Sequence, residues 1–234
     1  MAVALRACAP PAVRPGGCYV RRVLLLLDFD GTLTDHDTLD LLVAEHAPGV
    51  WLEAERALTD GTMTLNEVIA FEFGHVHATL DEALAVLRAR VALRPGLEEL
   101  IDFCHERFID PVVVSSGFTE VIEPMLAWGG VKLPVVAHSA AFSPEGTTVT
   151  FLARESCDAC GEPCKRMELD RLAAGRQIAY VGDGWSDRCA AKAADLVFAR
   201  GTLAEHLAAE GVPFQPFDDL FDVRDGLRRY LSPA

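Results

Sequence analysis

The sequence lacks long hydrophobic runs and is short of basic residues, and each shortage excludes a class of protein. No stretch reaches the ~18 consecutive apolar residues of a membrane-spanning helix, so we expect no transmembrane segment. The 21 lysines and arginines are outnumbered by 35 aspartates and glutamates, which leaves a net charge of −14. This balance disfavours nucleic acid or an anionic membrane surface as the main partner.

The sequence also lacks internal repeats, low-complexity segments and a recognisable secretory signal. Residues 1–20 contain arginines, prolines and glycines but no continuous apolar stretch of signal-peptide length. We therefore expect a flexible N-terminal extension over residues 1–20 and a cytoplasmic protein. Seven cysteines, an odd number, then fit reduced thiols better than a framework of disulfides.

Strand and helix patterns alternate along most of the chain. Apolar runs at residues 23–27, 111–114 and 178–181 are typical of buried strands, and helical spacing follows each of them. Such alternation predicts an α/β fold with a doubly wound, mainly parallel sheet.

A block with only helical spacing interrupts this alternation after the first strand. Within it, Thr64 and Glu67 are placed to form a capping box at the start of a helix. We expect a small all-helical insertion over residues 36–94, and a core made of residues 21–35 and 95–234.

Two carboxylates follow the first predicted strand directly, in the segment Asp28-Phe29-Asp30-Gly31-Thr32. The carboxyl ends of strands in an open α/β sheet form the edge where ligands bind. Two carboxylates at this spacing suit one residue that attacks and one that moves a proton. Both also suit a hard cation such as Mg²⁺.

Two later strands also end in polar clusters. One contains Ser115 and Ser116, whose hydroxyls and neighbouring amides could hold a phosphoryl oxygen, and the other contains Asp183 and Asp187, which could complete a metal site. Lys165 lies between the two clusters in sequence and would offset the negative charge gathered there. Because the carboxyl ends of parallel strands share one edge, we expect these side chains to converge.

These residue types predict phosphoryl transfer. A cation and Lys165 would remove the repulsion between a phosphate monoester and an attacking carboxylate. Asp28 would attack in line to form an aspartyl phosphate, and Asp30 would protonate the leaving oxygen and then activate water.

Taken in order, the segments at 28–32, 112–116, 165 and 182–187 resemble the four motifs of the haloacid dehalogenase-like phosphatase superfamily. The resemblance covers about residues 23–200 and implies the same roles for Asp28 and Asp30, with Mg²⁺ as cofactor. It implies metal ligation by Asp28, Asp30, Asp183 and Asp187. For the second motif it favours Ser115, with the amides of Ser116 and Gly117 as further phosphate donors.

The helical insertion resembles the small cap of the phosphoserine-phosphatase-like branch. More closely, the segments at 60–64, 164–165 and 194–200 resemble the methionine-salvage phosphatases, which act on a 2-hydroxy-3-keto-5-methylthiopentenyl phosphate. Phosphoethanolamine and phosphocholine phosphatases share much of this pattern. The expected function is Mg²⁺-dependent hydrolysis of a small phosphorylated metabolite.

Other activities of this fold stay open. Phosphoserine, phosphoethanolamine or phosphocholine are alternative substrates, and a phosphotransferase would pass the group to an alcohol instead of water. The presence of Asp30 argues against cleavage of a carbon–halogen or phosphorus–carbon bond, since a proton donor suits an oxygen leaving group. A non-catalytic binding protein is disfavoured because every catalytic position is filled.

Five residues are candidates for selecting the leaving group. Asp37 could hold a substrate ammonium or could simply open the next helix, and Glu120 has the same two interpretations. Met63, Phe71 and Phe73 are apolar pocket candidates that also suit the core of the helical unit.

Three cysteines in eight residues precede Lys165. Cys157, Cys160 and Cys164 could bind Zn²⁺ with a fourth ligand from elsewhere, such as His138 or Asp158. The alternative is a reduced loop without metal.

Overall fold

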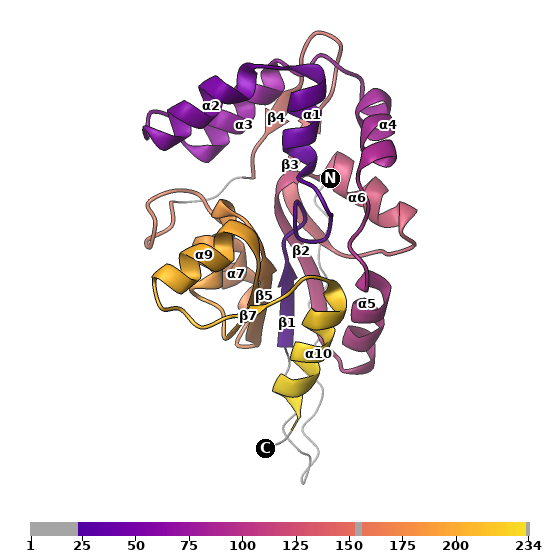
Figure 1. Cartoon of the computed structure of the whole chain (residues 1–234), viewed down its shortest axis with the longest axis vertical. Helices are drawn as coiled ribbons and strands as arrows, with labels where there is room; N and C mark the ends of the chain where they lie inside the picture. Colours follow the sequence, from indigo (N-terminus) through magenta and orange to yellow (C-terminus); the bar gives the residue numbers. More distant parts are fainter. Residues whose placement is uncertain (1–22, 153–155, 233–234) are drawn as a thin grey trace.

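A mixed sheet forms the centre of the molecule (Figure 1). The computed structural model describes residues 23–152 and 156–232, so the extension predicted over residues 1–20 lies outside it. Within the described residues the sheet has seven strands in the order β4-β3-β2-β1-β5-β6-β7. They are β1 (Val23–Leu27), β2 (Asp110–Phe118), β3 (Val135–Ala141), β4 (Thr148–Thr150), β5 (Gln177–Gly182), β6 (Leu196–Ala199) and β7 (Gln215–Pro216).

All neighbouring strands are parallel except β3 and β4, which form an antiparallel hairpin. The prediction of a mainly parallel α/β sheet is therefore confirmed. The short turn at residues 143–146 joins β3 to β4 and accounts for their antiparallel pairing, since a turn of this length can join only antiparallel strands.

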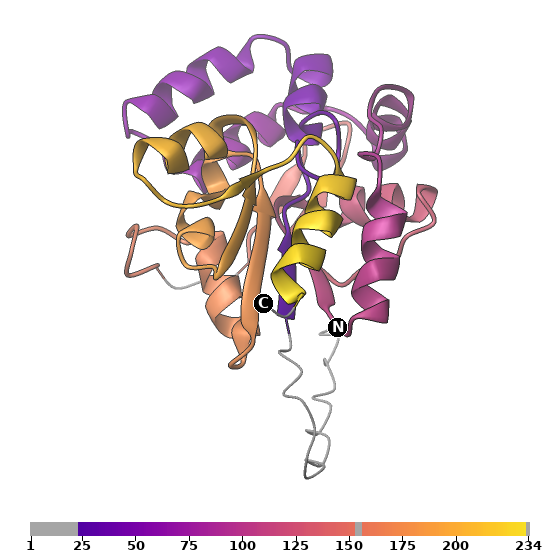
Figure 2. The same cartoon turned by 60° about the horizontal axis from the view of Figure 1, so that its bottom comes forward.

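Helices cover both faces of the sheet (Figures 1 and 2). One face carries α5 (Leu97–Glu106), α6 (Thr119–Trp128) and α10 (Leu220–Leu231), and the other carries α7 (Lys165–Ala173), α8 (Arg188–Ala191) and α9 (Gly201–Ala209). The central strand β1 is buried throughout. Its side chains alternate between the two layers: Leu25 and Leu27 pack on one face, and Leu24 and Leu26 on the other.

Four helices lie between β1 and α5 and gather at one end of the molecule (Figure 1). They are α1 (Thr38–His46), α2 (Val50–Thr59), α3 (Leu65–Gly74) and α4 (Leu80–Arg90). The predicted capping box of Thr64 and Glu67 is confirmed at the start of α3. Thr79 and Glu82 repeat the same device at α4.

The chain enters and leaves this helical group through two adjacent segments. Thr34 and Leu93 form an antiparallel bridge, and the amide of Asp35 donates to the carbonyl of Ala92 at 3.0 Å. The group is also fastened to the β3–β4 hairpin, where the amide of Thr147 donates to the carbonyl of Phe73 at 3.2 Å.

No helix in the described part of the chain has the length and apolar character needed to cross a membrane.

Candidate active site

The first acidic motif begins where β1 ends. The amide of Asp28 still pairs with the carbonyl of Val181 on β5 at 2.9 Å, and the chain then turns away from the sheet. Gly31 makes this turn with φ of +70°, and a Cβ there would lie 2.3 Å from the Asp183 carboxylate. Only glycine fits both conditions. The turn therefore brings the motif against the end of β5.

Lys165 joins the two acidic clusters through a buried ion pair. Its Nζ lies 2.5 Å from Asp28 Oδ1 and 2.7 Å from Asp187 Oδ1, and all three side chains are buried. Burial alone would lower the pKa of Lys165, but Asp187 and Asp28 outweigh it and raise the pKa. The ammonium group is therefore held charged in the centre of the site.

Asp187 is the most fully hydrogen-bonded carboxylate of this group. Its Oδ1 accepts from Lys165 Nζ and from the Tyr180 hydroxyl, both at 2.7 Å. Its Oδ2 accepts from the amides of Asp183 and Gly184, both at 3.0 Å. Asp187 thus fixes the position of Lys165 and the loop that carries Asp183.

Three carboxylates are arranged as a cation site. Oxygens of Asp28, Asp183 and Asp187 all lie within 4.8 Å of one another. Desolvation raises the pKa values of Asp28 and Asp183, and repulsion from Asp187 raises them further. Such a set of hard oxygen donors, destabilised by its own charge, fits a divalent cation such as Mg²⁺. The Thr32 hydroxyl donates to Asp183 Oδ1 at 2.7 Å and orients that carboxylate.

The Asp30 carboxylate does not join this group, although the sequence predicts it there. Its Oδ1 accepts from the amide and hydroxyl of Thr38, and its Oδ2 accepts from Ser115 Oγ at 3.3 Å. The group of carboxylate oxygens that lie within 4.8 Å of one another contains Asp28, Asp183 and Asp187 but not Asp30. Desolvation raises the pKa of Asp30 despite the hydrogen bonds from Thr38, so this carboxyl is suited to carrying a proton.

The two serines of the second cluster have different surroundings. Ser115 is fully buried, and its Oγ accepts from the amide of Gly117 at 2.8 Å. That amide, predicted as a phosphate donor, is thus engaged within the protein. Ser116 instead lines the cavity above the carboxylates. The geometry favours Ser116 for contact with a ligand and Ser115 for holding Asp30.

A cavity of about 560 Å³ lies between the sheet edge and the helical group. This volume is typical of small-molecule sites. Its floor contains Asp28, Asp30, Lys165 and Asp183. The apolar walls come from α1 to α3, and the lining also contains two tryptophans, Trp51 and Trp185.

Four acidic residues of the helical group also face this cavity: Asp37, Asp40, Glu55 and Glu72. Asp37 caps α1 through hydrogen bonds from the amides of Leu39 and Asp40, so its predicted helix-opening role is confirmed. Desolvation followed by repulsion from Asp30 and Asp40 raises the pKa of Asp37. The upper cavity is therefore strongly acidic.

The remaining pocket candidates lie in different places. Phe73 is buried against Phe118, in the core, and Met63 lines a neighbouring cavity of about 610 Å³. Glu120 ties α6 to β3, because its carboxylate accepts from the amide of Ala140 at 2.9 Å. Phe71 contacts the ring of His75 on the outer part of α3.

Two residues contribute to the site although no local sequence pattern predicts it. Tyr180 lies in an apolar strand and looks like an ordinary core residue, yet its hydroxyl bonds Asp187. Arg94 is buried below the first motif, where it donates to the carbonyls of Gly31, Thr32 and Thr34 at 2.9 Å each. Only contacts between distant segments reveal these roles.

Comparison with known proteins agrees with this geometry. A family model described as haloacid dehalogenase-like hydrolase matches residues 25–192. The 2-hydroxy-3-keto-5-methylthiopentenyl-1-phosphate phosphatase of Geobacillus kaustophilus is 31% identical over 220 residues, which cover 89% of this chain and 97% of that protein. The enzyme of the same name from Geobacillus thermodenitrificans is 30% identical over 218 residues, with 89% and 97% covered.

Solved structures of similar fold include two phosphoserine phosphatases. The one from T. onnurineus has a TM-score of 0.65 at 20% identity, with 93% of this chain and 98% of that chain covered. A phospho-aspartyl intermediate analogue of phosphoserine phosphatase has a TM-score of 0.65 at 20% identity, with 89% and 98% covered. The family model spans Asp28, Lys165 and Asp187, the residues that the structure gathers at the sheet edge, and the chain therefore belongs to the haloacid dehalogenase-like hydrolases.

Proposed function

We propose that this protein is a Mg²⁺-dependent phosphatase of small-molecule phosphomonoesters that works through an aspartyl phosphate on Asp28. The observation that carries this proposal is the buried arrangement of Asp28, Lys165 and Asp187. Asp28 and Lys165 line the cavity beneath the helical group together with Asp183. No other described part of the chain combines a nucleophile, a fixed cation and a carboxylate cation site.

Asp28 and Asp183 would hold the metal, and the neighbouring Asp187, whose two oxygens already accept four hydrogen bonds, would support the site by fixing the loop that carries Asp183. When bound there, Mg²⁺ would supply positive charge that offsets repulsion between the phosphate and the Asp28 carboxylate. Lys165 stabilises the charge that spreads over the phosphoryl oxygens, and Ser116 at the cavity wall donates a hydrogen bond to the same group.

The protein's own carboxylates perform the two chemical steps. Asp28 attacks phosphorus while the bond to the leaving oxygen breaks, and Asp30 gives that oxygen a proton. Asp30 then takes a proton from water, which attacks the aspartyl phosphate and releases inorganic phosphate. Thr38 and Ser115 keep Asp30 in place between the steps.

We further propose that residues 36–94 act as a cap over a core of residues 21–35 and 95–234. The paired crossings at Thr34 and Leu93 support a hinge, because the chain passes from the core to the helical group and back at these adjacent points. Closure would exclude bulk water while the aspartyl phosphate forms. A cytoplasmic location, inferred from the lack of a recognisable secretory signal in residues 1–20, stays a prediction.

Two substrate classes have separate support. The named relatives at about 30% identity favour 2-hydroxy-3-keto-5-methylthiopentenyl phosphate. The acidic upper cavity, with Asp40, Glu72 and the ring of Trp51, instead favours a cationic leaving group such as ethanolamine or choline. Both classes share the phosphoryl chemistry and differ only in what the cap contacts.

The test is phosphate release from a panel of these esters with Mg²⁺, comparing wild type with Asp28→Asn. We expect turnover to fall by on the order of 10³-fold or more in the variant, as for other removed nucleophiles. Asp102→Asn, on the exposed side of α5, is the matched control and keeps its activity. Full activity of Asp28→Asn would refute the mechanism, and preference for an added alcohol acceptor would indicate a phosphotransferase.

A further inference from the structure

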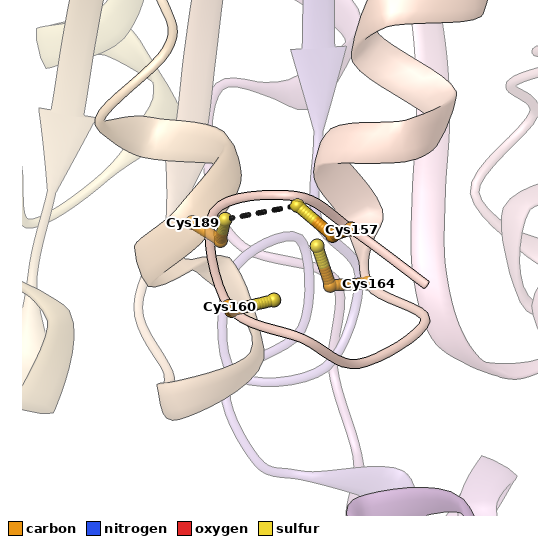
Figure 3. A group of neighbouring side chains, drawn as sticks. All are labelled: Cys157, Cys160, Cys164 and Cys189. Atoms are coloured by element: carbon orange, nitrogen blue, oxygen red, sulfur yellow. Dashed lines mark hydrogen bonds between the residues drawn. The ribbon is translucent and has the colours of Figure 1, made fainter. Parts of the chain in front are cut away.

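Four cysteines lie together beside the proposed active site (Figure 3). Cys157, Cys160 and Cys164 come from the loop before α7, and Cys189 comes from the first turn of α8. Their sulfur atoms all lie within 4.8 Å of one another. The fourth member is therefore Cys189, not His138 or Asp158 as the sequence suggests; His138 Nδ1 accepts instead from the amide of Leu152 at 3.1 Å.

The sulfur spacing suits a tetrahedral metal better than a disulfide. Zn–S bonds of about 2.3 Å in a regular tetrahedron place neighbouring sulfurs about 3.8 Å apart. Cys157 Sγ and Cys189 Sγ are 3.7 Å apart, whereas a disulfide requires about 2.05 Å.

Backbone hydrogen bonds in the loop fix the positions of two of these cysteines. The amide of Gly161 donates to the carbonyl of Cys157 at 2.7 Å, and the amide of Cys157 donates to the carbonyl of Glu162 at 3.0 Å. Gly161 reverses the chain with φ of +79°, which other residues rarely adopt. This tight turn places Cys157 and Cys160 side by side before any metal binds.

The surroundings also suit a four-thiolate site. Four thiolates with one divalent ion carry a net charge of −2, and the guanidinium groups of Arg166 and Arg188 interact with Cys189. An all-sulfur set selects soft or borderline ions over Mg²⁺. Four protein ligands leave no open position, so such a site is structural rather than catalytic.

We propose that Cys157, Cys160, Cys164 and Cys189 bind one Zn²⁺ ion. This ion would hold the segment that contains Lys165 against the segment at residues 182–187. Cys164 immediately precedes Lys165, and Cys189 follows Asp187 by two positions. The same two segments already meet in the interior, where Lys165 Nζ and Asp187 Oδ1 are 2.7 Å apart. The metal is thus a second connection that fixes the direction from which Lys165 enters the site.

The test is the metal content of the full chain, purified from zinc-supplemented cells and freed of loosely held ions. We expect one zinc ion per chain in wild type. In Cys189→Ala the zinc content per chain should be lower by at least about tenfold, because a site with three thiolates binds zinc more weakly. Cys104→Ala is the matched control, since Cys104 is buried in α5 away from the cluster and its loss should leave the zinc in place. Wild type without zinc, or equal zinc in Cys189→Ala, overturns the proposal.

Two measurements on wild type keep the test decisive if Cys189→Ala fails to fold. Titration with a mercurial thiol reagent should release zinc in step with the reaction of four thiols, and Co²⁺ exchanged into the site should show the absorption of a tetrahedral thiolate complex. Zinc release without consumption of thiols, or an intact mass lowered by the two hydrogens of a disulfide, contradicts the proposed zinc site. Because neither readout depends on turnover, the result stands apart from the phosphatase assay.

Discussion

The sharpest prediction concerns Glu72, an acidic residue of α3 that faces the cavity. Desolvation and then repulsion from Asp40 raise the pKa of its carboxyl from 4.5 to about 7. At about 1.36 kcal/mol for each pH unit between these values, an unscreened carboxylate would cost roughly 3.4 kcal/mol of folding free energy above pH 7. Glu72 is only half-buried, so solvent screening reduces the expected cost to about 1 kcal/mol.

The sign of the pH dependence follows from the raised pKa. The folded protein holds the Glu72 proton more tightly than the unfolded chain does, so the stability present below pH 4.5 is lost as pH rises towards 7. Glu72→Gln cannot ionise. The variant should therefore match wild type near pH 4.5 and exceed its unfolding free energy by about 1 kcal/mol above pH 7.

Urea denaturation between pH 4.5 and 8.5 measures this difference. Glu53→Gln, on the exposed face of α2, is the control for the general gain from removing one negative charge from an acidic protein. A gain that is the same at every pH, or as large in Glu53→Gln, would refute the reasoning. If the substrate is cationic, Glu72→Gln should also raise KM above pH 7 while leaving kcat nearly unchanged.

Three other predictions follow from contacts around the first motif. Gly31→Ala places a methyl group against Asp183 and should weaken Mg²⁺ binding by about tenfold or more in calorimetric titration. The control is Gly61→Ala, which is also at positive φ but lies in open space. It should cost only about 1 kcal/mol of stability and leave the Mg²⁺ affinity unchanged. In Arg94→Lys the ammonium group cannot donate to all the carbonyls that the guanidinium contacts, so the unfolding free energy from chemical denaturation should fall by about 2–4 kcal/mol. A fall of less than about 0.5 kcal/mol would count against this role of Arg94. In the first turnover, Asp30→Asn should slow release of an alkyl alcohol by about 10²–10⁴-fold but slow release of p-nitrophenol less, because that leaving group needs no proton. Equal slowing of both releases in rapid-mixing assays of the first turnover would argue against Asp30 as the acid.

Features that depend on residues close together in the sequence could be predicted from the sequence. The buried strand β1, the helix α4 and the capping box at Thr64 follow from local spacing and side-chain chemistry. The convergence of Asp28 and Asp183 was predictable too, since β1 and β5 are parallel and end at one edge. Rules of this kind need only the order of elements, not their detailed packing.

Features that depend on distant contacts could not be predicted in this way. Helix α7 begins at Lys165, whose ion pairs with Asp28 and Asp187 join it to two distant segments of the chain. Cys189 stands alone in the sequence and meets the other thiols only when α8 packs against α7. The C-terminal α9 and α10 lie beyond the last motif and were not predicted.

The paired crossings at Thr34 and Leu93 have a consequence for how new specificities arise. Because the chain leaves and re-enters the core at adjacent points, the stretch between them can be exchanged between relatives without moving Asp28 or Lys165. The hydrogen bond from Thr147 to Phe73 shows that the hairpin would have to be transplanted with it. A chimaera that carries both pieces should inherit the donor's substrate preference, and one that carries the helices alone should fold poorly.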